Sequence, residues 1–595
     1  MLSVHRIAGR GACILFLIAL AVPVASTTLD DIGYTKLQLE LGAALPDGSS
    51  VTATQVEANS LNDGGIAYTP DPTHVNFSGK TINDLTGLST AFSAHATSVG
   101  RQFYGAPDPN TPGTSISSAP AVTTIDSYLA DEWLFTDFLR VDQNQQPKSS
   151  LSRIANHSWI GRMGDTNTDP LNSETLRRFD WLVETDEFVQ VVGFTGSGSN
   201  PLLGSAYNGI AVNTTTTLST TGTVNIDSVY NGNRTGVSLV APKAFASGAT
   251  ARVASAAALL ADVGHKNPGL STDPATTSTT NRDGVQIHNA ERSEVIKAAL
   301  MAGASRVSHN STVSNLVNYR VDPAHQTING LDRRYGAGQL EIYNSYRIIV
   351  AAEQNSAEDD GSGSGQINNA GFDYDPFFGG AQSSNSEASY YFSTTGSPTV
   401  LSATLVWNID IDGSSQNNFD PTATLYDLDL RLYDVTDINN PVLIGHSESA
   451  LENTETVFSS LSPGVAYMLR VKAGVGQTPF NWDYALAWNI AADADSDGTA
   501  DERDNCINIP NVPLATDPGG NAQLDTNGDG YGNACDADLN NDGVVNGLDV
   551  GPFTVEFGTT GPDADLNGDG TVNGLDVGPF VSGFGQAPGP SALAQ

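Results

Sequence analysis

The chain has 595 residues, enough for several domains of about 150 residues each. Lys and Arg number 27 against 66 Asp and Glu, which gives a formal net charge of −39. Nucleic acids and anionic membrane surfaces bind basic surfaces, so this charge excludes both as partners. The 60 Gly and 29 Pro favour sheets and loops over a helical bundle.

Residues 1–26 begin with a basic stretch that contains Arg6 and Arg10. An apolar run at 12–22 and small residues at 24–26 follow, which is typical of a secretory signal peptide. The apolar run is too short to span a bilayer comfortably. We therefore expect a secreted or cell-surface protein with no membrane span after signal removal.

Cysteine usage agrees with export. Cys13 leaves with the predicted signal peptide, so Cys506 and Cys535 remain. An even pair in an oxidising compartment predicts one disulfide. Closing its loop of about 29 residues would stabilise the fold by about 3 kcal/mol in the chain-entropy model. A free-thiol nucleophile is the weaker interpretation, because both residues lie in an acidic, Gly-rich region with no nearby His.

The pattern of hydrophobic residues changes along the chain. Residues 27–352 mix short β-branched runs with Ala-rich helical segments, which predicts an α/β domain with a parallel sheet. Residues 353–385 contain a polar, Gly/Ser-rich run that is typical of a linker. Residues 386–492 alternate between apolar and polar in short runs, which predicts an antiparallel β-sandwich. From 493 onward Asp dominates.

Four acidic segments repeat the register of a calcium loop. Such a loop places oxygen ligands at positions 1, 3, 5, 7, 9 and 12 and Gly at position 6, and position 7 ligates through its carbonyl. Without a cation these carboxylates repel one another, whereas bound Ca²⁺ turns the repulsion into coordination and folding energy. The predicted ligands are Asp493, Asp495, Asp497, Thr499, Asp501 and Asp504; Asp525, Asn527, Asp529, Tyr531, Asn533 and Asp536; Asp538, Asn540, Asp542, Val544, Asn546 and Asp549; and Asp565, Asn567, Asp569, Thr571, Asn573 and Asp576.

The last two loops form an internal repeat in which 16 of 21 positions match at a spacing of 27 residues. Residues 537–585 thereby resemble a dockerin module, a family that docks onto cohesin domains, which implies a cohesin-like or cell-surface partner. Dockerins often carry polar recognition residues just before position 12, where this chain has Leu548 and Leu575. Residues 493–536, with their two cysteines, resemble thrombospondin type 3 repeats, and residues 586–595 form a tail.

One serine has the setting of a nucleophile. Ser247 precedes an Ala- and Leu-rich segment that favours a helix, and a short strand ends just before it. Unpaired backbone N–H groups and the helix dipole favour developing negative charge at such an N-terminus. The alternative is that Ser247 is an ordinary N-cap. His95 opens a small-residue segment, and an alternating strand at 51–57 ends in Glu57.

Taken together, these segments resemble the subtilisin-like serine proteases, or subtilases, over about residues 33–350. The segment 95–100 is close to the family's His motif, and 245–260 matches its Ser motif at Ser247, Ala249, Val253, Ala254 and 256–260. Residues 156–161 resemble the strand that pairs with substrate, and 201–212 resemble the stretch after the oxyanion residue. The order acid, His, Ser is also that of the family.

The resemblance implies roles for individual residues. Ser247 would attack the scissile carbonyl, His95 would accept its proton, and the acid would orient His95. The family's Asp is replaced by Glu57, with Asp63 as the alternative acid, and the oxyanion position falls on Ser197, with Asn200 as its alternative. We therefore expect a secreted, calcium-binding serine endopeptidase that acts on proteins or peptides. The alternative is a non-catalytic surface protein on the same scaffold.

Overall fold

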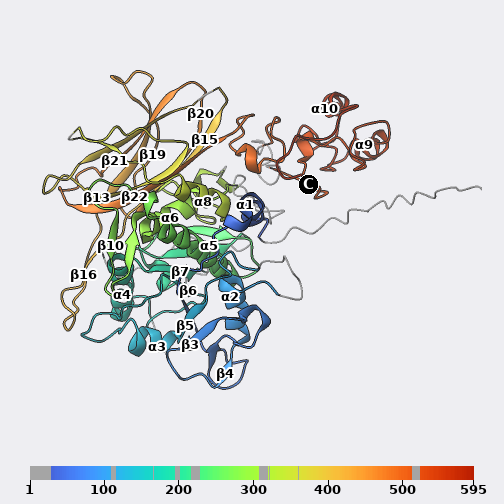
Figure 1. Ribbon diagram of the computed structural model, residues 1–595. Helices are drawn as coiled ribbons and strands as arrows, with labels where there is room; N and C mark the ends of the chain where they lie inside the picture. Colours follow the sequence, from blue (N-terminus) through green and yellow to red (C-terminus); the bar gives the residue numbers. More distant parts are fainter. Residues whose placement is uncertain are drawn as a thin grey trace, which may run out of the picture.

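The computed structural model describes residues 29–108, 116–164, 166–194, 201–215, 228–306, 319–320, 322–359, 361–394, 396–511 and 523–594. These form an α/β region, two antiparallel sheets and a set of acidic loops (Figure 1). The predicted signal peptide at 1–26 lies outside the described residues. Among the described helices, none is long and apolar enough to cross a membrane.

A seven-stranded parallel sheet is the centre of the α/β region. Its order is β3-β5-β1-β6-β7-β8-β9. The strands are Thr81–Asp84 (β3), Thr124–Leu129 (β5), Ala53–Glu57 (β1), Ile154–His157 (β6), Val189–Gly193 (β7), Ile210–Thr214 (β8) and Leu239–Ala241 (β9). Two small pairs join Ala67–Thr69 (β2) to Ala91–Phe92 (β4) and Ser278–Thr280 (β10) to Gln286–His288 (β11). The predicted parallel α/β domain is confirmed.

Helices cover both faces of this sheet. Ile154 and Val191 face a core that includes α5, whereas their neighbours Ala155 and Val192 face a second core with Phe179 of α4. β1 is therefore buried at every position instead of alternating as predicted, since parallel strands between two helical layers have no solvent face. The helices are Tyr34–Leu41 (α1), Ala94–Tyr104 (α2), Ala130–Glu132 (α3), Pro170–Asp186 (α4), Ala246–Lys266 (α5), Ser293–Ala302 (α6) and Ile342–Val350 (α8).

Two antiparallel sheets follow and enclose a common core of aromatic and aliphatic side chains. The first sheet contains Ala357–Glu358 (β12), Glu387–Ser393 (β14), Ala466–Ala473 (β21), Leu428–Asp434 (β18) and Val442–Ser447 (β19). The second contains Ala370–Phe378 (β13), Trp482–Ala492 (β22), Thr399–Val406 (β15) and Thr454–Leu461 (β20), and a side ribbon joins Asp410–Asp412 (β16) to Thr422–Thr424 (β17). The antiparallel arrangement predicted for 386–492 is confirmed.

The prediction of a linker over 353–385 is wrong for much of that range. β13 lies inside it and pairs with β22 along most of its length. Phe372 and Tyr374 of β13 are buried in the core that also contains α6 and α8. The Gly/Ser run is a tight connection, because Gly361, Gly363 and Gly365 all adopt positive φ. The β region therefore begins before 386 and packs directly on the α/β region.

The acidic C-terminal region contains little regular structure. Its helices are Val550–Glu556 (α9) and Val577–Ser582 (α10), each directly after an acidic loop. A small core includes Phe553 and Phe580, whose rings stack with centroids 4.6 Å apart. The loops lie beside the sheets, in the red part of Figure 1. The predicted pair of loop–helix units is thus present in outline.

Candidate active site and calcium loops

The topology of the parallel sheet brings the end of β1 next to the end of β6. The chain first adds β3 and β5 on one side of β1 and then crosses to β6 on the other side, so the winding direction reverses between β1 and β6. In open α/β sheets, sites form outside the carboxyl ends of the strands at such a reversal. Glu57 is the last residue of β1, and Ser158 directly follows β6.

Glu57 and His95 form the best-defined polar contact at this edge. Nδ1 of His95 lies 2.9 Å from Oε2 of Glu57. The Glu57 side chain is 1% exposed, whereas that of His95 is 47% exposed. The contact therefore holds one edge of the imidazole against a buried carboxylate and leaves the rest of the ring accessible.

A second layer of hydrogen bonds fixes the carboxylate. Nε2 of Gln55 donates to Oε1 of Glu57 at 2.8 Å and to the Ala96 carbonyl of α2 at 2.9 Å. Tyr104 in turn donates its hydroxyl to Oε1 of Gln55. Both oxygens of Glu57 are thus engaged, which locks the longer Glu side chain in one orientation. The sequence analysis missed Gln55, although its position two residues before Glu57 places it on the same side of the strand.

The environment of His95 favours its charged form. The hydrogen bond to Glu57 raises the pKa of His95, burial acts in the opposite direction, and the charges of Glu57 and Asp63 raise it further. Asp63 accepts a hydrogen bond from the backbone N–H of Ala94 at 2.9 Å, just before the ring. The two candidate acids therefore differ in role, since Glu57 contacts the imidazole and Asp63 contacts the start of α2.

Ser247 is the second residue of α5, as the sequence predicts. Its hydroxyl donates to the Ser158 carbonyl at 3.3 Å, and the Ser158 hydroxyl donates to the Ser247 carbonyl at 3.0 Å. These reciprocal bonds hold the start of α5 at the end of β6. α2 packs along α5, so His95 and Ser247 lie in the first turns of two packed helices. Both residues are described, and no hydrogen bond joins their side chains in this structure.

The predicted oxyanion donors Ser197 and Asn200 lie outside the described residues. The strand that leads toward them does reach the site. A Cβ on Gly193, the last residue of β7, would lie 3.3 Å from Oγ1 of Thr250 in the first turn of α5. The segment 156–161 ends β6, and its Gly161 forms an isolated parallel bridge with Pro201.

All four acidic loops share the backbone geometry of the predicted calcium register. Gly at position 6 has φ near +90° in each loop, at Gly498, Gly530, Gly543 and Gly570. The carboxylate at position 1 accepts the backbone N–H of that glycine in every loop, at 2.6–3.1 Å. Only glycine adopts this conformation readily, so the turn that folds the ligands inward depends on it.

The carboxylates of the first loop are close enough to hold one cation. Oxygen atoms of Asp493, Asp495 and Asp497 lie within 4.8 Å of one another. Burial, together with the neighbouring carboxylates Asp497 and Asp504, raises the pKa of Asp495 to about 7. Hard oxygen donors crowded in this way fit Ca²⁺, which offsets their mutual repulsion. The position-12 carboxylates Asp504, Asp536, Asp549 and Asp576 are all buried.

The predicted disulfide is confirmed: Cys506 and Cys535 are bonded and join the first two loops. The tail then returns to the same place. Pro590 accepts from the Ile507 N–H at 3.1 Å, and Ala592 donates to the Asp504 carbonyl at 2.9 Å. The predicted boundary at 536/537 is therefore no break in packing, because residues after 585 cover the first two loops.

The last two loops embrace each other symmetrically. Val545 of the third loop exchanges backbone hydrogen bonds with Gly585 and Gln586 after α10. Val572 of the fourth loop exchanges equivalent bonds with Gly558 and Thr559 after α9. Residues 27 positions apart thus make the same contacts, as the internal repeat suggests.

Comparison with known proteins identifies one part of the chain. Residues 491–514 and 524–558 match the thrombospondin type 3 repeat, so this region is a calcium-binding repeat of extracellular type. The match continues past the predicted boundary into the third loop. No curated protein matches the chain.

Two solved structures were compared with it. One is a mitogen from Yersinia pseudotuberculosis, with 13% identity over 17% of this chain and 84% of that chain and a TM-score of 0.10. The other is a protein from Sulfurospirillum deleyianum, with 10% identity over 20% of this chain and 97% of that chain and a TM-score of 0.12. At these scores neither likeness bears on fold or function.

Proposed function

We propose that this protein is a secreted, calcium-binding serine endopeptidase of the subtilase class. The observation that carries the proposal is the contact between Nδ1 of His95 and the buried carboxylate of Glu57. It lies at the topological reversal of the parallel sheet, with Ser247 at the start of the adjoining central helix. The order of these residues along the chain is that of the subtilases.

In the proposed reaction, the proton on Nδ1 of His95 is held by Glu57, so Nε2 is free to act as the base. The hydroxyl of Ser247 attacks the carbonyl carbon of the scissile peptide bond, and Nε2 accepts its proton. Protonated His95 then donates that proton to the leaving amine, and Glu57 stabilises the imidazolium. Water completes the cycle by hydrolysing the acyl-enzyme.

The extra methylene of Glu57 is accommodated within this scheme by its hydrogen bonds. Gln55 holds the oxygen that does not contact His95. The hydroxyl of Ser247 points to the Ser158 carbonyl, so a rotation about its χ1 must precede attack. Catalytic hydrogen bonds are often loose without substrate and tighten in the complex.

A fluorophosphonate probe tests the proposal directly, because it labels only a serine that a base has activated. We expect the calcium-loaded protein to be labelled and Ser247→Ala to remain unlabelled. Ser460→Ala, which removes an exposed hydroxyl from β20, is the matched control and should label like the wild type. Failure of the folded wild-type protein to react would reject the peptidase.

A non-catalytic surface protein on the same scaffold is the second candidate. The hydrogen bond of the Ser247 hydroxyl to a backbone carbonyl, instead of to His95, favours it. The labelling experiment separates the two candidates, since an inactive scaffold would leave Ser247 unreactive although the calcium repeats bind normally.

The paired loops at 537–585 support a docking role of dockerin type. Apolar side chains recur on their surface at the 27-residue spacing: Leu548 is 67% exposed and its counterpart Leu575 is 66% exposed. Val550 with Val577 and Phe557 with Phe584 repeat the arrangement. An exposed apolar surface of this kind is typical of a protein-binding site. A cohesin-like or cell-surface partner is therefore proposed to bind there and to anchor the enzyme.

A further inference from the structure

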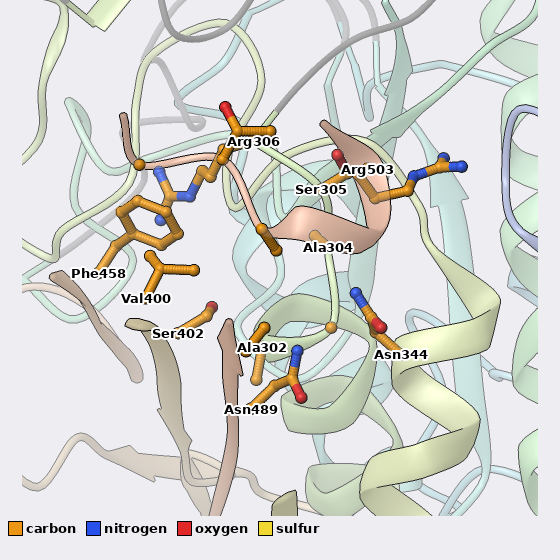
Figure 2. A pocket seen from close by; sticks show the side chains of 15 residues that line it. Ala302, Ala304, Ser305, Arg306, Asn344, Val400, Ser402, Phe458, Asn489 and Arg503 are labelled. Atoms are coloured by element: carbon orange, nitrogen blue, oxygen red, sulfur yellow. The ribbon is translucent and has the colours of Figure 1, made fainter. Parts of the chain in front are cut away.

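A cavity lies where the α/β region, the second antiparallel sheet and the first calcium loop meet, away from Ser247 and His95. The end of α6 and the segment 303–306 form one wall, and strands β15, β20 and β22 form another. Gly498 and Thr499 of the first calcium loop close it. Apolar side chains, among them Val400 and Phe458, make up much of the lining (Figure 2).

The feature of interest is the side chain of Arg306, which lines this cavity. Arg306 is only 6% exposed, yet all three of its guanidinium nitrogens lack a hydrogen-bond acceptor among the described residues. The guanidinium lies over the ring of Phe458, 4.6 Å from its centroid, as Figure 2 shows. A buried cation without a hydrogen-bonding partner is costly, so natural proteins rarely keep one unless something binds it.

The position of Arg306 is held by its backbone. The preceding residue, Ser305, exchanges two backbone hydrogen bonds with Gln339, at 2.8 and 2.9 Å. The guanidinium is therefore presented from a fixed point and cannot simply swing out to solvent. Its stacking on Phe458 further restrains the plane of the guanidinium.

The neighbouring charges do not neutralise Arg306. Asp332 is near, but it pairs with Arg320 at 3.8 Å and accepts the backbone N–H groups of Arg334 and Tyr335. Arg503, on the far side of the cavity, pairs with Glu341. Burial and the charge of Arg320 lower the pKa of Arg306 well below its usual range, and Asp332 opposes them in part. An anion in the cavity would restore the charged form.

We propose that this cavity binds the carboxylate of a ligand with a short apolar body, and that Arg306 is its recognition residue. The planar fork of a guanidinium matches the two oxygens of a carboxylate. The apolar lining suits a hydrocarbon substituent and disfavours a strongly hydrated inorganic anion. Such a carboxylate is presented by a small organic acid and equally by the C-terminus of a peptide.

Calorimetric titration of the full chain in saturating calcium tests the proposal with isobutyrate and with acetyl-Ala-Ala, each beside its neutral amide. We expect saturable binding of at least one carboxylate and none of its amide. Binding of isobutyrate alone would identify a free acid, and binding of the peptide alone would identify a chain end. Binding of neither, or equal binding of the amides or of sulfate, would overturn the proposal.

Substitution of the arginine makes the assignment specific. Arg306→Met keeps the packing on Phe458 and removes the buried charge, so the variant should fold without loss of thermal stability. It should lose carboxylate affinity by about tenfold or more, as expected for losing a hydrogen bond to a charged group. Arg306→Lys keeps the charge without the fork and should bind more weakly than the wild type.

Arg333→Gln is the matched control, because Arg333 is exposed and does not line the cavity. It should bind the carboxylate like the wild type. Unchanged affinity in Arg306→Met would overturn the assignment even if the protein bound carboxylates elsewhere. Because the readout is binding heat, the outcome is independent of whether Ser247 is a nucleophile.

Discussion

Glu57 shows how one side chain can be given a defined task by its immediate neighbours. Gln55, His95 and the backbone of α2 surround it, so its carboxylate has a fixed direction despite its extra methylene. Asp63, the other acid that the sequence suggests, bonds to the backbone at the start of α2. The sequence predicted Glu57 as the first choice, and the structure places it against His95.

This contact predicts a pH effect at His95. Because Glu57 raises its pKa, the folded state holds the proton more tightly than the unfolded chain, in which the value is about 6.5. The stabilising contribution is present below that value and is lost as pH rises through the higher folded pKa. Peptidase activity, which needs neutral His95, should rise over the same interval.

Replacing the carboxylate tests the pH effect. In Glu57→Gln we expect the pKa of His95 to fall and the rate of peptide hydrolysis to drop by up to about 10⁴, as when a triad acid becomes an amide. NMR titration of the imidazole measures the pKa without relying on activity. Asp63→Asn should lower the pKa much less, and a larger shift in that variant would assign the acid to Asp63.

At the scale of elements, the calcium loops follow from short-range sequence rules. Each ligand set lies within one short segment, so register alone brings its residues together once Gly at position 6 turns the chain. The thrombospondin type 3 match over 491–514 and 524–558 agrees with the first three loops. β13 is the opposite case, since its strand identity depends on pairing with β22, more than 100 residues away.

The loops predict a calcium stoichiometry of four per chain. Asp549→Asn removes a buried position-12 carboxylate from the third loop and should reduce the stoichiometry to three or weaken one site by at least tenfold. Equilibrium dialysis against calcium measures both quantities. Asp131→Asn, an exposed residue of α3, is the control and should change neither.

Removing all calcium with a chelator should unfold the loops, because this region has only a small apolar core. Limited proteolysis should then cut within 493–594 first. Full calcium binding by Asp549→Asn, or resistance of the chelated loops to protease, would contradict the assignment.

At the scale of the whole molecule, three differently stabilised regions are packed together. The α/β region and the antiparallel sheets share a hydrophobic core through β13, β22, α6 and α8. The first calcium loop is joined to the α/β region mainly by charge, through Arg503 with Glu341 and Arg347 with Glu502. These exposed and half-exposed pairs are few compared with the net charge of −39, so calcium also reduces the charge repulsion of the whole chain.

The symmetric surface of the last two loops predicts how the molecule is anchored. If Leu548 and Leu575 contact a partner, the double variant Leu548→Asp with Leu575→Asp should abolish calcium-dependent binding to purified cohesin domains, because it places charge on an apolar surface. Surface plasmon resonance with and without calcium measures the effect. Val475→Asp, at an exposed apolar site outside the loops, should bind like the wild type. Equal binding by the double variant would exclude this surface.

The sequence alone determined the α/β, antiparallel and calcium-loop order, the disulfide and the position of Ser247 at a helix start, because these depend on local pattern and spacing. Only the tertiary structure decided that 370–378 is a strand, that Gln55 braces Glu57 and that Arg306 is buried without an acceptor. Each of these depends on groups that are distant along the chain or that share a strand face, and local propensity does not encode such contacts.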